Sequence, residues 1–220
     1  MNLILYYLFV YLIEAIILWL YCNRIFTSRK NTFLSLLITI GMFSLLIPVA
    51  ILTNAALNAF CSFIVYLCCI VLNYDSKPVW ALFHALALTI LMALSEGLIA
   101  AAIPDITIYA FRDGNIHSSA FTFVILSKSV YLCISQLVTR IFSKDTVNNA
   151  SIRKSTLMLY LIPVMSSIIT VSLGYICLNG KLSGSDSVIV FICLVLLLSI
   201  NILTFYLQQD ISQKNVEYAR

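Results

Sequence analysis

Seven continuously apolar stretches alternate with short polar segments along the chain. None shows the alternation of apolar and polar residues that is typical of membrane β-barrel strands. A helix needs about 20 apolar residues to cross the hydrocarbon core of a bilayer. The pattern therefore predicts an all-α membrane protein, a bundle of about seven transmembrane helices. The predicted spans are Leu3–Cys22, Phe33–Leu52, Ala55–Leu72, Val79–Ile103, Ala120–Phe142, Leu157–Leu178 and Val188–Leu207.

The first stretch is interpreted as a retained span rather than a signal peptide. It has no basic residue before the apolar run and no small-residue cleavage site after it. Aromatic residues gather at both of its ends, which is typical of side chains at the two membrane interfaces. This predicted interfacial belt consists of Tyr6, Tyr7, Phe9 and Tyr11 at one end and Trp19, Tyr21 and Phe26 at the other.

Two features interrupt the regular pattern of spans. The second and third spans are separated only by a few residues around Thr53 and Asn54, which predicts a tight helical hairpin, with one long bent helix as the alternative. Pro48 and Pro163 lie inside the second and sixth spans, where proline removes a backbone hydrogen bond and kinks a helix. Pro163 is a candidate hinge, although a static kink would have the same sequence.

The composition leaves almost no chain for a folded domain outside the membrane. Hydrophobic residues make up 62% of the chain and charged residues 10%, against roughly 45–50% and 25% in globular proteins. The seven cysteines lie in apolar stretches, without a CxxC pair or a histidine at metal-ligand spacing. They are interpreted as small core residues, and no metal or other cofactor is expected.

Basic residues are distributed unequally between the two sides of the predicted bundle. Ten lie in the first, third and fifth connections and the tail, whereas only Arg112 and Lys181 lie on the other side. The positive-inside rule then places the N-terminus outside and the C-terminus in the cytoplasm. The net charge of +4 is thus a signal of topology, and no nucleic-acid partner is expected.

Four ionisable residues lie inside predicted spans: Glu14, His84, Glu96 and Lys128. Such groups cost about 2.5–3.5 kcal/mol or more at the centre of a membrane helix, so they are candidates for function. We hypothesise a Lys128–Glu96 ion pair with Glu14 nearby, in which one carboxylate is left needing a proton or a ligand. The alternative is that the pair only pins two helices together. His84 is expected to be an ordinary interfacial histidine, with a proton relay as the less favoured alternative.

The fourth span carries a small residue at every fourth position. Small side chains let membrane helices approach closely, so this span is expected to cross several neighbours. Glu96 lies beside this ridge and is therefore expected to face protein rather than lipid. The ridge consists of Ala81, Ala85, Thr89, Ala93, Gly97 and Ala101.

Sequence motifs of catalysis are not found. The chain has no GxSxG, HExxH or phosphate-binding GxxxxGK[ST] motif and only two histidines, so no catalytic residue and no enzymatic activity are expected. The largest external feature is the connection 104–118, which is either a docking loop for a peptide or a solvated loop at the interface. The candidate docking residues are Tyr109, Phe111, Arg112 and Asp113.

The chain is expected to divide into a transmembrane region, 1–207, and the start of a cytoplasmic helix, 208–220. The tail has no glycine or proline that would end a helix after Leu207. It is interpreted as the truncated beginning of a signalling and dimerisation helix.

Scattered polar positions occur within or next to the spans in five stretches of the chain, 11–17, 76–86, 91–98, 161–167 and 201–207. The chain resembles the membrane sensor region of bacterial histidine kinases with a GHKL-type ATPase domain, the group that includes the accessory-gene-regulator peptide-pheromone receptors. The resemblance implies a seventh helix that leads into a dimerising helix with a phosphoacceptor histidine and an ATP-binding domain, neither of which this sequence contains.

The expected function is that of a membrane sensor in a two-component system, located in the bacterial plasma membrane. Its expected partners are the lipid bilayer, a peptide or small-molecule signal, a second copy bound through the helix after Leu207, and a cytoplasmic kinase and response regulator when the protein is full length. One alternative is the substrate-binding membrane component of a vitamin-type importer. A weaker one is a scaffold without a ligand.

Overall fold

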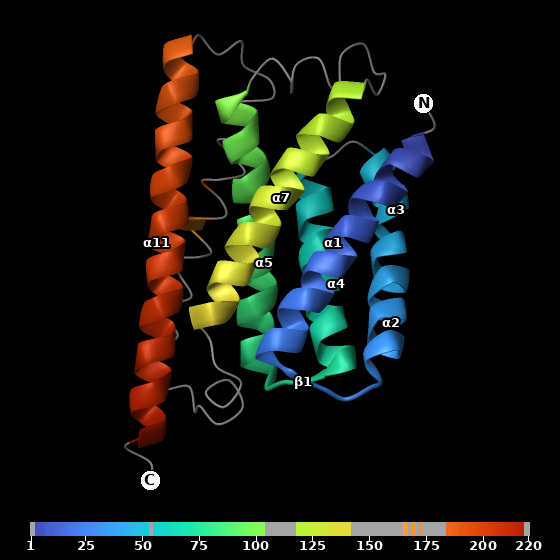
Figure 1. Cartoon of the computed structure of the whole chain (residues 1–220), viewed down its shortest axis with the longest axis vertical. Coiled ribbons are helices and arrows are strands. Elements are labelled where there is room, and N and C mark those ends of the chain that lie inside the picture. Colours follow the sequence, from blue (N-terminus) through green and yellow to red (C-terminus); the bar gives the residue numbers. More distant parts are fainter. Residues whose placement is uncertain are drawn as a thin grey trace.

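The chain forms a bundle of long helices, described here from a computed structural model (Figure 1). The structure describes residues 3–52, 55–103, 118–141, 165–166, 169, 172 and 184–217. Its helices are α1 (Leu3–Ile25), α2 (Thr32–Ser44), α3 (Leu46–Ile51), α4 (Ala55–Asn73), α5 (Pro78–Ala102), α7 (Ser118–Ile141) and α11 (Gly184–Glu217).

Five helical segments within these residues are long and apolar enough to cross a membrane. They are Leu3–Ile25, Thr32–Ile51, Pro78–Ala102, Ser119–Arg140 and Asp186–Leu207, and Leu57–Asn73 is a shorter apolar helix. The prediction of an all-α membrane protein is therefore confirmed. The predicted sixth span, Leu157–Leu178, lies outside the described residues apart from 165–166, 169 and 172.

The second span is broken, as its proline predicts. Helix α2 ends at Ser44 and α3 begins at Leu46, so Leu45 marks the break. Pro48 has no backbone N–H with which to reach the carbonyl of Ser44 one turn back, which accounts for the position of the break. Helix α4 packs against both α2 and α3, so the hairpin interpretation is confirmed over the single bent helix.

The first and third connections meet at one end of the bundle. Strands β1 (Thr27–Ser28) and β2 (Tyr74–Asp75) pair antiparallel, and Arg29 forms an exposed ion pair of 3.2 Å with Asp75. Helices α1, α7 and α11 all end toward this side and carry Arg24, Arg140 and Lys214 in their last turns (Figure 1). Among the described residues, Arg24, Arg29, Arg140 and Lys214, which the sequence pattern places on one side, therefore lie toward the end of the bundle opposite the N-terminus.

The predicted aromatic belt of the first span is wrong for four of its members. Tyr6, Tyr11, Tyr21 and Phe26 are 4% exposed or less and belong to the core. Two of the hydroxyl groups form hydrogen bonds inside the bundle. The Tyr11 hydroxyl donates to Asn58, and the Tyr21 hydroxyl is hydrogen-bonded to His84. The exposed face of α1 carries aliphatic side chains instead: Leu3, Ile4, Leu5, Leu8, Leu12 and Ile16.

Helix α5 is the most buried of the five candidate spans and packs against α4, α7 and α11. The prediction that it crosses several neighbours is thus confirmed. Gly97 allows a close approach of α11, because a Cβ at this position would lie 3.2 Å from Leu194 Cδ1 of α11. Near the ends of the contact, Ser187 Oγ donates to the carbonyl of Ala101 at 2.7 Å, and the rings of Phe83 and Phe205 meet edge to face.

Candidate functional site

Three helices bring three ionisable side chains together inside the bundle. Lys128 on α7 donates from Nζ to Oε1 of Glu14 on α1 and, at 2.5 Å, to Oε1 of Glu96 on α5. The predicted Lys128–Glu96 ion pair with Glu14 nearby is therefore present. We call these three residues the charged cluster.

The members of the charged cluster differ in exposure. The side chains of Glu14 and Lys128 are 3% and 2% exposed, whereas that of Glu96 is 40% exposed. Glu14 is enclosed because α1 packs closely here, with Ala15 fully buried beside it. The expectation that Glu96 faces protein is correct for its ion pair, but its side chain also borders open space.

The charged cluster contains one carboxylate more than it has ammonium groups. When all three groups are ionised, its net charge is −1. Oε2 of Glu14 is buried and accepts no hydrogen bond from the described part of the chain. A buried carboxylate oxygen without a donor is costly, so this arrangement favours the arrival of a proton or a cation.

A cavity of about 200 Å³ adjoins the charged cluster, and Glu14, Glu96 and Lys128 all line it. Its lining residues come from the N-terminal halves of α1 and α7 and from α4 and α5. Aromatic and polar side chains form much of the remaining wall. They are Tyr6, Tyr7, Tyr11, Asn58, Phe123 and Ser127, together with the apolar Val10, Met92 and Val124.

The tyrosines of this wall are fixed by contacts with one another and with α4. The rings of Tyr7 and Tyr11 are stacked with centroids 6.3 Å apart, and Tyr6 meets Tyr7 edge to face at 5.3 Å. Tyr11 Oη donates to Oδ1 of Asn58 at 2.8 Å. The tyrosine part of the wall is therefore held in place by contacts within α1 and between α1 and α4.

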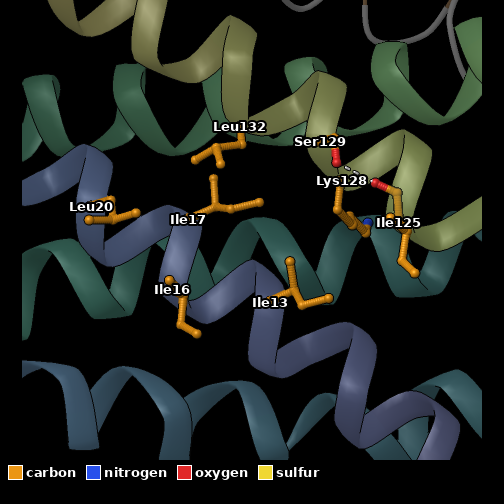
Figure 2. A pocket seen from close by; sticks show the side chains of 8 residues that line it. All are labelled: Ile13, Ile16, Ile17, Leu20, Ile125, Lys128, Ser129 and Leu132. Atoms are coloured by element: carbon orange, nitrogen blue, oxygen red, sulfur yellow. Dashed lines mark hydrogen bonds between the residues drawn. The ribbon is translucent and has the colours of Figure 1, made fainter.

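A second hollow lies between α1 and α7 and also touches Lys128 (Figure 2). Its walls are aliphatic except for Lys128 and Ser129, and the Ser129 hydroxyl donates to the carbonyl of Ile125 at 2.6 Å. Such a groove has little with which to recognise a polar ligand and suits a hydrocarbon chain. The other lining residues are Ile13, Ile16, Ile17, Leu20 and Leu132.

His84 is not the interfacial residue that its position in the sequence predicts. It is fully buried, and its Nδ1 lies 2.7 Å from the hydroxyl of Tyr21. The rings of Phe26, Trp80 and Phe83 surround it, with centroids 5.1–5.8 Å away. The expectation failed because the depth of a residue along a helix does not tell which face it occupies.

Several predicted site residues lie outside the described part of the chain. These are the docking-loop residues Tyr109, Phe111, Arg112 and Asp113 and the candidate hinge Pro163. Among the residues that the structure does describe, no group of three or more His, Cys, Asp or Glu could hold a metal ion.

The sequence did not identify the wall of the cavity. The sequence pattern places Tyr6, Tyr7 and Tyr11 at the lipid interface and gives no sign that Asn58 lies beside them. One signal was available: positions 7, 11 and 14 follow the spacing of a single helix face, so Tyr7 and Tyr11 share a face with the intramembrane Glu14.

The comparisons with known proteins do not assign the chain to a family. No family model matches it, and neither a curated protein nor a solved structure does.

Proposed function

We propose that the chain is a membrane sensor that binds a signal beside its charged cluster and passes a conformational change to α11. It is not an enzyme in this proposal, and its output is the position of a helix. The resemblance to the sensor regions of GHKL-type histidine kinases supports this function over that of a scaffold.

The observation that carries the proposal is the position of two consecutive residues on α5. Glu96 borders the cavity and belongs to the charged cluster, while Gly97 packs against Leu194 of α11. A shift or rotation of α5 that repositions Glu96 must also move the surface on which α11 rests. A ligand that favours one position of Glu96 therefore shifts the equilibrium between two packings of α11.

The length of α11 supports a role in output. Its 34 residues extend about 51 Å at the rise of an α-helix, against about 30 Å for the hydrocarbon core. The helix continues without a break beyond Leu207, and Lys214 pairs with Asp210 one turn away. It projects past the rest of the bundle at the end away from the N-terminus (Figure 1).

The proposal includes the remaining parts of a two-component sensor. The N-terminus and the cavity face outward, and α11 enters the cytoplasm of a bacterial cell. Two copies pair through the segment after Leu207, and a longer form of the protein carries the kinase region that acts on a response regulator. The unequal distribution of Lys and Arg supports this orientation.

The function can be tested by measuring the position of α11. Spin labels at Thr32 and Lys214, both exposed, report the distance between the start of α2 and the tail of α11 in lipid nanodiscs. The labels are introduced as T32C and K214C in a background whose seven native cysteines are replaced by alanine. Glu96→Gln, which removes the charge of the exposed carboxylate, is expected to change the distance distribution.

Asp75→Asn provides the matched control, because it neutralises an exposed carboxylate far from the cavity. The control is expected to leave the distribution unchanged. An unchanged distribution in Glu96→Gln would contradict the sensor. If the variant instead opened the cavity to reagents from the C-terminal side, the importer alternative would replace the sensor.

A further inference from the structure

The cavity beside Glu96 has the chemistry of a site for a small organic cation. Its lining includes the charged cluster, in which two carboxyl groups face one ammonium group. Glu96 is the accessible carboxylate, and Lys128 is its sole polar contact within the described residues. An incoming positive charge would therefore find a carboxylate that it can approach and an excess of negative charge to neutralise.

Glu14 gives a second, independent indication of a cation. Its side chain is 3% exposed, it lines the cavity, and its Oε2 has no hydrogen-bond donor among the described residues. Lys128 is already shared between two carboxylates, so it cannot fully neutralise both. A further donor in the cavity would reduce the cost of keeping Glu14 ionised in an apolar setting.

The walls and size of the cavity narrow the class of cation. Aromatic rings attract organic ammonium groups through the negative potential of their faces, and four aromatic side chains line this cavity. Its volume of about 200 Å³ is several times the roughly 30 Å³ that a water molecule takes in the liquid. A bare inorganic ion would leave most of this space unfilled, whereas drug-sized ligands need pockets of about 300–1,000 Å³.

We propose that the cavity binds the protonated amino group of a small organic amine, with Glu96 as the accepting carboxylate and Tyr6, Tyr7 and Tyr11 as the aromatic wall. The proposal rests on the sensor function only in that the amine would be the signal. As a binding site it stands separately, because an importer could use the same cavity.

The test compares two probes of nearly equal size and shape on the full chain in nanodiscs. n-Butylammonium carries the charge, and 1-butanol does not. Because a ligand that binds the folded state raises its unfolding temperature, we expect a saturable rise with n-butylammonium and none with 1-butanol. Sodium chloride at matched ionic strength is expected to produce no rise of this kind.

Three variants locate the site. Glu96→Gln is expected to weaken n-butylammonium binding by roughly 10-fold or more, because the charged partner of the ammonium group is lost. Tyr7→Leu keeps every charge but removes one aromatic ring, and we expect binding roughly 2- to 30-fold weaker. Asp75→Asn, the exposed control, should bind as the original chain does.

Equal responses to the two probes, or a sodium response that Glu96→Gln abolishes, would overturn the amine proposal. An unchanged affinity of Tyr7→Leu for n-butylammonium would also overturn it. This second variant keeps the amine proposal testable even if Glu96→Gln does not fold. The two proposals fail in different ways. If n-butylammonium does not raise the unfolding temperature but Glu96→Gln still changes the spin-label distance, the amine site is wrong and the sensor function is retained. If n-butylammonium binds but the spin-label distance does not change, the amine site is retained and the sensor function is wrong.

Discussion

Replacing Lys128 by methionine would test how the charged cluster contributes to stability. The substitution keeps the length and most of the volume of the side chain but removes its ammonium group. It leaves Glu14 and Glu96 facing each other without the cation that now lies between them. At least one of these carboxylates must then take up a proton or the local packing must open.

The structure sets the magnitude through the burial of the lost group. Removing one partner of a buried ion pair costs about 3–5 kcal/mol, and Lys128 is nearly fully buried. Glu14→Gln should cost less, because its amide oxygen can still accept from Lys128 and a balanced Lys128–Glu96 pair remains. The predicted order of destabilisation is therefore Lys128→Met well above Glu14→Gln, even though the two side chains are equally inaccessible.

The free energy of unfolding can be measured by titrating the protein out of mild detergent micelles with a denaturing detergent. Lys214→Met is the matched control, since Lys214 is exposed and its i,i+4 pair with Asp210 is of a kind worth about 0.3–0.5 kcal/mol. The reasoning is refuted if Lys128→Met is no more destabilising than this control. It is also refuted if Glu14→Gln costs as much as Lys128→Met, because the excess of negative charge would then have no energetic consequence.

Three further predictions concern other contacts. Gly97→Leu should displace α11 and change the spin-label distance to its tail, whereas Gly97→Ala should change it little, because the flexible leucine on α11 can move by a few tenths of an ångström. Tyr21→Phe should lower the free energy of unfolding by about 1–3 kcal/mol by removing the buried hydrogen bond to His84, as measured by the same denaturation. Exchanging Glu96 and Lys128 (E96K/K128E) should destabilise the bundle, because it places a second carboxylate against the buried Glu14, and should abolish butylammonium binding. If the exchanged variant still binds the amine, the accepting carboxylate is not Glu96.

The elements of the bundle could be predicted because lipid imposes a simple rule on sequence. A spanning segment must satisfy its own backbone hydrogen bonds and present apolar side chains, so its limits are visible as polar interruptions. The break of the second span could likewise be predicted, because Pro48 acts on its own backbone and needs no distant partner. The position of basic residues such as Arg29 at one end of the bundle could also be predicted, because Lys and Arg recur in every second connection along the sequence.

The faces of the helices could not be predicted with the same success. In a soluble protein the polar residues of a helix show which face contacts water. In a membrane protein the lipid and the protein interior are both apolar, so the sequence does not distinguish the two faces. Tyr6 and Tyr21 were assigned to the interface for this reason, and His84 was placed there from its depth alone. The charged residues are the exception, because the cost of an isolated charge in the membrane requires a partner. The meeting of Glu96 and Lys128 could therefore be inferred without coordinates.

The three side chains of the charged cluster differ in exposure, and this difference supports a role for Glu96 in binding the proposed signal. A cluster that served only to pin helices would not need a carboxylate in excess of its ammonium group, because an uncompensated buried charge is costly. In this bundle the carboxylate left accessible is Glu96, which lies on the helix that also supports α11. The two more buried members, Glu14 and Lys128, hold α1 and α7 together and so provide a fixed reference against which Glu96 can move. A cation that neutralises Glu96 would weaken its attraction to Lys128, and α5 would carry that change to Gly97 and onward to α11.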